Sequence, residues 1–414
     1  MNYKNYKKST EAKTLLANFL SLSILQVASY IFPLFTLPYL ARVIGTDGFG
    51  KIAFAGSVIS WIQTIADWGF TYSATRDVAQ NRNDKEKVSE IFSEVLWARC
   101  FLVIVSFLVL ITLICSVSYF RENTFVILIT FLTIPGHLCF PDWFFQAIER
   151  MKFITYFNLI IRVLFSCGVF LFIKHESDYW LQPLLMSLGS LLCGLISLYL
   201  IVLKWQYKLY KPKFNKIVLC IKNSTDIFVT NIVPSFYNNL SVVFLGAYGG
   251  AIANGIYEGG NKIITVANQF LSIISRVFFP YLSRHPNKHS TYAKINIILA
   301  AIVAIFLFFC SSLVVEIILA DGFKESAVVL KILAISYFFL ALDNSYGTNY
   351  LIVVHKEKTL RNITFLASFI GLIISWPLIT TYSYTGAALT VCVSRVLLGS
   401  LVYVYAKKYN IESL

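Results

Sequence analysis

Long apolar stretches alternate with short polar segments along the whole chain. The stretches 100–120, 179–203 and 295–315 contain no Asp, Glu, Lys or Arg. As a helix, each is long enough to cross a hydrocarbon core of about 30 Å. The pattern predicts an all-α membrane protein with about twelve spanning helices, the second and fourth of them interrupted by Asp67 and His137. We expect the spans at residues 15–40, 51–70, 96–118, 124–142, 153–173, 180–203, 224–247, 262–282, 294–319, 328–354, 360–381 and 384–406.

Composition supports this class and argues against an enzyme. The chain is 57% hydrophobic and 14% charged, whereas a soluble domain carries about 25% charged residues. The eight cysteines are scattered without paired spacing, and the five histidines form no convincing ligand pattern. We therefore expect no metal and no cofactor. The sequence also lacks the glycine-rich phosphate loop of an ATPase.

Lysine and arginine alternate between the two sides of the predicted membrane protein. They gather at the N-terminus, in the loops that follow every second span, and in the C-terminal tail. Because basic loops remain in the cytoplasm, this pattern predicts an even number of spans with both termini cytoplasmic. The net charge of +14 is spread over these loops, so nucleic acid is not an expected partner.

The chain reads as two similar halves of six spans. A basic loop at 204–223 separates residues 1–210 from residues 211–414, which we expect to form two lobes around a central cavity. A shift of 201 residues aligns Pro33 with Pro234, Phe35 with Phe236, Gly45 with Gly246 and Gly48 with Gly249. Repeats of six spans point the same way and are related by an axis along the membrane normal.

Several ionisable residues fall inside predicted spans, where each costs about 2.5–3.5 kcal/mol unless it faces water or a partner. The deepest are Arg162, Arg276, Asp343 and Arg395, and Asn238 and Asn239 lie side by side in the seventh span. One interpretation is a cationic cavity that grips a diphosphate through the arginines and asparagines. The other is that Asp343 pairs with Arg395 while the remaining arginines reach toward the membrane surface.

Charges near the ends of spans carry less weight. We expect Arg99 to be interfacial, whereas Asp67 is a candidate for coupling transport to an ion. Asp343 is a second candidate for ion coupling or for pairing within the cavity.

Several motifs resemble those of the bacterial O-antigen repeat-unit flippases. The first is Pro33-Leu-Phe-Thr-Leu-Pro-Tyr-Leu-Ala-Arg-Val-Ile-Gly45, which includes Pro38 and Arg42. It is followed by Asp67-Trp-Gly-Phe70, Ser73-Ala-Thr-Arg76 and Pro141-Asp-Trp-Phe-Phe-Gln-Ala-Ile-Glu-Arg150. Gly255-Ile-Tyr-Glu258 and Pro280-Tyr-Leu-Ser283 complete the resemblance, which covers essentially the whole chain.

The resemblance implies a fold and a transport activity. The family belongs to the multidrug, oligosaccharidyl-lipid and polysaccharide exporter superfamily, which implies two six-helix lobes and alternating access. It also implies a substrate, an undecaprenyl-diphosphate-linked oligosaccharide, moved from the cytoplasmic to the periplasmic leaflet of the inner membrane during lipopolysaccharide synthesis. An O-antigen polymerase and a chain-length regulator are the partners that it suggests.

Three other interpretations of the sequence stay open. A drug or cation extruder of the same superfamily would be expected to have an acidic cavity. An O-antigen polymerase would be expected to have a long periplasmic loop, but every predicted outer loop is short. A non-transporting scaffold for polysaccharide assembly would give no reason for arginines within spans.

Overall fold

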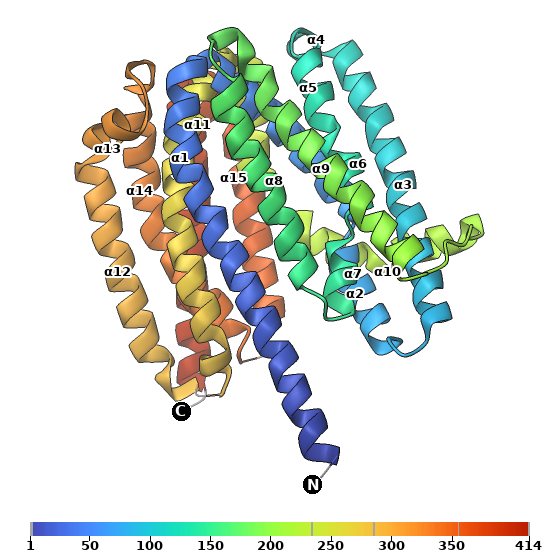
Figure 1. Cartoon of the computed structure of the whole chain (residues 1–414). Helices are drawn as coiled ribbons and strands as arrows, with labels where there is room; N and C mark the ends of the chain where they lie inside the picture. Colours follow the sequence, from blue (N-terminus) through green and yellow to red (C-terminus); the bar gives the residue numbers. More distant parts are fainter. Residues whose placement is uncertain (1–2, 233–234, 285, 355, 413–414) are drawn as a thin grey trace. The chain divides into compact units, whose positions relative to one another are not determined.

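The computed structural model describes residues 3–232, 235–284, 286–354 and 356–412, with only the backbone described at 3–30 and some later positions. Most of these residues are helical, and none of the described residues forms a strand (Figure 1). The predicted all-α fold class is therefore confirmed. The chain forms two compact units, one made of Met1–Tyr39 and Val58–Ile232 and the other of Leu40–Ser57 and Val233–Leu414.

Unit 1 holds most of α1 and the helices up to α10. Their bounds are α1 Tyr3–Asp67, α2 Phe70–Gln80, α3 Lys85–Ser116, α4 Ser118–Glu122, α5 Thr124–Phe131, α6 Thr133–Cys139, α7 Asp142–Ala147, α8 Lys152–Phe172, η1 Glu176–Trp180, α9 Leu181–Tyr199, η2 Leu200–Lys204 and α10 Phe214–Ile232. Helix α9 packs against α6 and α8. Small residues allow the first contact, since a Cβ on Gly194 would lie 2.5 Å from the carbonyl oxygen of Gly136.

Unit 2 holds the segment 40–57 of α1 and the helices from α11 onward. Their bounds are α11 Ser235–Arg284, η3 Pro286–Lys288, α12 His289–Phe309, α13 Ser311–Ile318, η4 Asp321–Phe323, α14 Ser326–Leu342, η5 Asp343–Leu351 and α15 Glu357–Glu412. Helix α14 packs against α11, α12 and α15.

Nine elements of the described chain are long and apolar enough to cross a membrane. Three of them lie in helices that contain one residue with non-helical backbone angles, namely Gly45 in α1, Gly250 in α11 and Ser383 in α15. If each break separates two crossings, the nine elements supply the twelve predicted spans. In α1 the break falls at Gly45 and not at Pro33 or Pro38, which lie within the helix.

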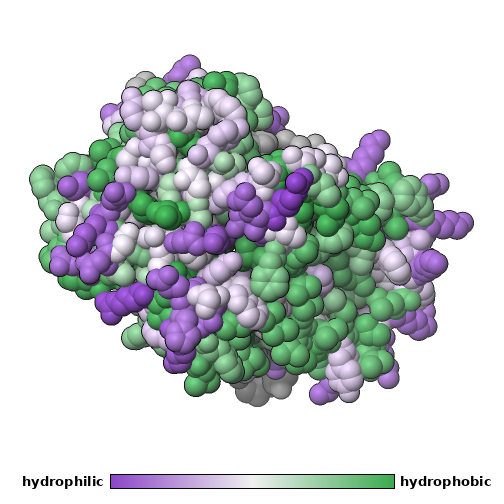
Figure 2. Space-filling view, turned by 90° about the horizontal axis from the view of Figure 1, so that it is seen from above, coloured by the Kyte–Doolittle hydropathy of each residue, from purple (hydrophilic) through white to green (hydrophobic). Residues whose placement is uncertain are grey.

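The outward surface of α12 is apolar, as expected for a helix in lipid. Its exposed large side chains follow helical spacing, at Ile295, Ile298, Ile302, Ile305 and Phe309. Small alanines occupy the opposite, buried side. Hydrophobic residues also cover broad parts of the surface that Figure 2 shows. A soluble protein would instead present polar side chains there.

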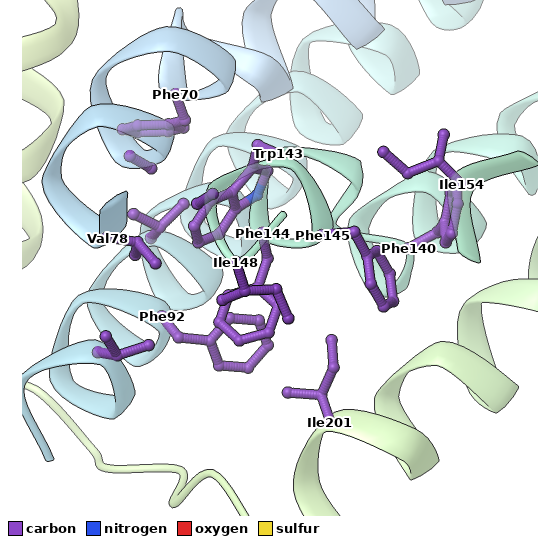
Figure 3. Packing of buried hydrophobic residues seen from close by; sticks show 14 of the residues in the cluster. Phe70, Val78, Phe92, Phe140, Trp143, Phe144, Phe145, Ile148, Ile154 and Ile201 are labelled. Carbon is purple, nitrogen blue, oxygen red and sulfur yellow. The ribbon is translucent and has the colours of Figure 1, made fainter. Parts of the chain in front are cut away.

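An aromatic core ties together the part of unit 1 that contains α2, α3 and α7. Phe92 packs against Trp143 and Phe144, with ring centroids 6.0 and 5.1 Å apart (Figure 3). Phe145 packs against Phe157 of α8. All of this short, largely buried α7 lies within the Pro141–Arg150 motif, so the motif's aromatic residues serve to pack α7 within the unit.

The breaks in α1 and α11 meet within unit 2 and contact one another reciprocally. A Cβ on Gly50 would lie 1.8 Å from the carbonyl oxygen of Ala251, and a Cβ on Gly255 would lie 2.0 Å from that of Thr46. Asn254 Nδ2 also donates to the carbonyl oxygen of Gly50 at 3.3 Å. Backbone meets backbone here, and only glycine leaves room for it.

This reciprocal contact changes the expected register of the internal repeat. The break residues Gly45 and Gly250 are 205 positions apart, as are Gly50 and Gly255, whereas the sequence match uses a shift of 201. The difference of four residues is about one helical turn and keeps the same helix face. Sequence identities along a helix therefore do not distinguish a shift of 201 from a shift of 205. The reciprocal contact does, because it is symmetric only with a shift of 205.

We predict that Gly255→Ala destabilises the protein by about 1–3 kcal/mol, because the methyl group has no room beside the Thr46 carbonyl. Gly56→Ala is the matched control, since a Cβ there meets nothing within 4 Å. The control is expected to be neutral or stabilising by about 0.4–1 kcal/mol. Thermal unfolding of the purified protein in detergent measures both. Equal midpoints for the two variants would contradict the close packing.

Candidate functional site

An ion pair joins α1 to α3 inside unit 1. Arg99 Nη2 lies 2.5 Å from Asp67 Oδ1, and Gln63 Nε2 donates to Asp67 Oδ2 at 2.9 Å. The Arg99 side chain is only 6% exposed, whereas that of Asp67 is 37% exposed. Arg99 Nε is buried and makes no hydrogen bond within the described part of the chain. The guanidinium is thus held inside the helix bundle with the carboxylate at its edge.

The Asp67-Trp-Gly-Phe motif explains why a carboxylate stands at this point. Asp67 is the last residue of α1, and the next two residues, Trp68 and Gly69, both adopt positive φ, 39° and 77°. Trp68 stacks on Phe228 with ring centroids 3.8 Å apart, which anchors the break. A carboxylate at the C-terminal end of a helix faces the negative end of the helix dipole, so it needs a cation such as Arg99.

Two further polar residues lie within electrostatic reach of Arg99. Asp142, the first residue of α7, accepts a hydrogen bond from the Trp143 backbone N–H at 2.8 Å. Both Asp142 and His137 interact electrostatically with Arg99 and with Asp67. The side chains of His137 and Asp142 are exposed at the surface of the unit. We call Asp67, Arg99, His137 and Asp142 the Arg99 cluster.

The Arg99 cluster is a polar patch within segments that are apolar enough to span a membrane. His137 and Asp142 belong to the candidate span Thr124–Ala147, and Arg99 belongs to Lys85–Ser116. Ionised groups exposed at membrane depth require water or a polar partner. The cluster can therefore line a hydrated surface, and its carboxylates and imidazole can hold protons or polar ligands. No group of three or more metal-ligating side chains occurs among the described residues.

The other residues predicted to bind substrate are dispersed over the two units. Arg162 lies in α8 of unit 1 and is half-buried, and its Nε is buried and makes no hydrogen bond within the described residues. Arg395 is buried in α15 of unit 2, and its Nη1 donates to Ser336 Oγ at 3.2 Å. Asn239 lies in α11 and is partly exposed. The side chains of Asn238 and Arg276 lie outside the described residues.

Asp343 begins the π-helical segment η5 in unit 2. Among the described residues it forms no ion pair with Arg395. The same segment carries Asn349, whose Nδ2 donates to Ser275 Oγ at 2.7 Å and to the Tyr292 hydroxyl at 3.1 Å. A buried polar network, and not a salt bridge, thus surrounds this part of η5.

The remaining motif residues have contacts outside the Arg99 cluster. Pro33 and Pro38 are half-buried in α1, and Gly45 is its break. Arg42 Nη2 donates to the carbonyl oxygen of Ile317 at 3.1 Å. Arg76 pairs with the neighbouring Asp77 at 3.0 Å on the exposed side of α2.

Sequence reasoning missed three of the four residues of the Arg99 cluster as site residues. It placed Arg99 at the membrane interface, and it noted His137 as a residue that interrupts the fourth span and as one of five histidines without a metal-ligand pattern. One signal was available, because an aspartate inside a span needs a cation and Arg99 begins the next predicted span. No comparable signal joins Asp142 to Asp67, since 75 residues separate them and only the fold brings both near Arg99.

Relatives with assigned names extend over nearly the whole chain. The "Putative O-antigen transporter" of Escherichia coli (strain K12) is 24% identical over 407 residues, which cover 96% of this chain and 98% of the relative. A protein of the same name from Shigella dysenteriae is 23% identical over 389 residues, covering 92% and 97%. "Capsular polysaccharide biosynthesis protein CapF" of Staphylococcus aureus is 24% identical and covers 64% of this chain and 70% of its own length.

Solved structures share the fold at lower identity. The lipid II flippase MurJ in an inward closed conformation superposes with a TM-score of 0.75 at 13% identity, covering 93% of this chain and 87% of that one. An inward-facing multidrug resistance MATE family transporter of the MOP superfamily gives 0.69 at 12% identity, covering 95% and 98%. These likenesses confirm the predicted exporter-superfamily fold.

A family model for polysaccharide biosynthesis proteins matches residues 15–285, which is more than half of the chain. The match includes the first-span motif, the Asp67 motif and the α7 motif. This chain belongs to the polysaccharide biosynthesis protein family.

Proposed function

We propose that this chain flips undecaprenyl-diphosphate-linked O-antigen repeat units from the cytoplasmic to the periplasmic leaflet of the bacterial inner membrane. The observation that carries the proposal is the full-length similarity to a protein named for O-antigen transport, with 96% of this chain covered. The polytopic fold, similar to that of a lipid II flippase, agrees with it. The basic loops favour cytoplasmic termini.

The physical task of a flippase is to carry a diphosphate and several sugars past hydrocarbon. A patch such as the Arg99 cluster supplies polar groups at membrane depth, where lipid offers none. Arg162 in α8 and Arg395 in α15 are further cations available to an anionic head group. The polyprenyl tail can stay in the bilayer throughout, because it is as apolar as the lipid.

Transport by this fold requires access from each side in turn. In our proposal residues 1–210 and 211–414 act as two lobes, and rocking between them opens the site first inward and then outward. Asp67 is the candidate for coupling this movement to a proton or cation, because its carboxylate is partly exposed beside Arg99. The protein performs no covalent chemistry in this scheme.

A drug or cation extruder is the second candidate. The Arg99 cluster contains two carboxylates and one guanidinium, and an excess of carboxylates suits a cationic ligand better than a diphosphate. This charge balance is the specific observation in its favour.

Deleting the gene in its native bacterium tests the proposed function. We expect the lipid-linked repeat unit to accumulate in the cytoplasmic leaflet and surface polysaccharide to be lost, and this is measured by leaflet-selective labelling of the glycan. Single units trapped in the periplasmic leaflet would indicate a polymerase. Unchanged polysaccharide together with new sensitivity to cationic drugs would favour the extruder.

The ion pair can be tested with a double-mutant cycle. Asp67→Asn leaves the buried Arg99 guanidinium without its partner and is expected to destabilise the protein by about 3–5 kcal/mol. Arg99→Gln leaves the Asp67 carboxylate, which is more than a third exposed, so its cost is expected to be smaller. The double variant removes both charges and should recover most of that stability. We expect it to reach wild-type protein levels while export of the repeat unit falls at least tenfold.

Asp321→Asn is the control for this cycle, because its partner Lys324 is 74% exposed and the pair lies at the surface. It should leave both protein level and export unchanged. If the double variant restores export along with protein level, the pair is structural and has no part in transport.

A further inference from the structure

A basic pocket lies in unit 1 beyond the aromatic core and is separate from the Arg99 cluster. Its volume is about 330 Å³, at the small end of the range for ligand pockets. Six residues line it: Arg82, Lys85, Ile148, Arg150, Trp205 and Tyr207. Ile148 is the one aliphatic member, so the lining suits a small charged group better than an apolar ligand.

Aromatic rings hold two of the cations in place. The Arg150 guanidinium lies over the Trp205 ring, 4.5 Å from its centroid, and Lys85 Nζ lies 5.6 Å from the centroid of Tyr207. Within the described residues, neither cation forms an ion pair with a carboxylate. A guanidinium stacked on a ring keeps its N–H groups free at the edge, where they can bind phosphate oxygens bidentately.

The rings that hold these cations are themselves fixed by the aromatic core. Trp205 packs edge-on against Phe145 and Phe153, with centroids 5.8 and 5.2 Å apart. Tyr207 packs edge-on against Phe144 at 5.1 Å. The core therefore determines where the two cations stand before any ligand arrives, which reduces the entropic cost of binding.

The backbone is unusual at two of the three segments that form the pocket. Glu149, between Ile148 and Arg150, has a φ of 57°, and so does Gln206, between Trp205 and Tyr207. Such left-handed angles are uncommon for residues other than glycine and cluster at functional sites. After α7, the Arg150 N–H bonds to the carbonyl oxygen of Phe145 at 2.8 Å, which turns the chain so that Arg150 reaches the pocket.

The charge of the pocket selects among anions. Arg82 pairs with Glu149 at 2.7 Å, so three cations and one carboxylate leave a formal excess of two positive charges. A diphosphate diester carries two negative charges, whereas the phosphodiester of a phospholipid carries one. The lining residues come from the loops that follow the second, fourth and sixth predicted spans, the side that the positive-inside pattern assigns to the cytoplasm.

We propose that this pocket binds the diphosphate of the lipid-linked substrate on the cytoplasmic side, where the substrate loads. The proposal rests on the proposed function, because that function supplies a diphosphate lipid at this face. Arg150 and Lys85 contact the diphosphate oxygens directly, while Trp205 and Tyr207 are positioning residues.

Binding to the purified full chain in nanodiscs of zwitterionic lipid tests the proposal without requiring transport. The probe is undecaprenyl diphosphate, with inorganic diphosphate and phosphatidylglycerol as competitors. We expect the double variant Lys85→Gln/Arg150→Gln to weaken binding of the probe at least tenfold. Lys85→Gln alone should weaken it at least threefold. Lys87→Gln is the control for lost charge, since Lys87 lies outside the pocket and pairs with Glu90 on the surface of α3.

Each outcome separates the pocket from the proposed function. Wild-type protein that binds the probe while the pocket variants bind equally well would overturn the pocket and leave the flippase intact. Wild-type protein that does not bind the probe would count against the flippase itself. If phosphatidylglycerol displaces the probe as effectively as inorganic diphosphate does, the pocket is a phospholipid site. That result would overturn its role in substrate loading.

Discussion

The absence of water in hydrocarbon is the constraint on which the rest of this structure depends. A backbone N–H or C=O group that enters the bilayer must find its partner inside the protein, so the described candidate spans are built from helices. Interruptions of the helices then need special support. Next to the breaks at Gly45 and Gly250 that support is close backbone contact, of Thr46 with Gly255 and of Ala251 with Gly50. At Trp68 it is an aromatic stack on Phe228.

The same constraint governs the charges. Arg99 is buried where no solvent can neutralise it, and Asp67 stands at a helix end that disfavours an anion. The ion pair stabilises both charges, the buried guanidinium and the carboxylate at the helix end. Asp142 adds a second carboxyl group from a different motif. Two motifs that are 75 residues apart thus place carboxyl groups within electrostatic reach of one guanidinium, and one of them, that of Asp67, forms an ion pair with it. That convergence is why we regard the Arg99 cluster, more than any single deep arginine, as the centre of the candidate site.

The aromatic residues of the Pro141–Arg150 motif connect this centre to the basic pocket. Trp143 and Phe144 pack against Phe92, whereas Phe145 and Phe144 position Trp205 and Tyr207. One short helix, α7, carries Asp142 at its start, and Arg150 lies three residues beyond its end. The motif therefore helps to position both the Arg99 cluster and the basic pocket within unit 1.

The sequence by itself determined the class and the approximate spans, because hydrophobic length and loop charge are local properties that decide which segments enter the bilayer and on which side their loops remain. It carried the family resemblance through short motifs, each contiguous in the chain. It also marked Asp67 and the motif around Asp142. Only the tertiary structure decided that Arg99 is buried against Asp67, that the break in α1 falls at Gly45, and that the segments after the α1 and α11 breaks make reciprocal contacts. Those features depend on contacts between segments far apart in the chain, and helical periodicity alone cannot specify which faces meet.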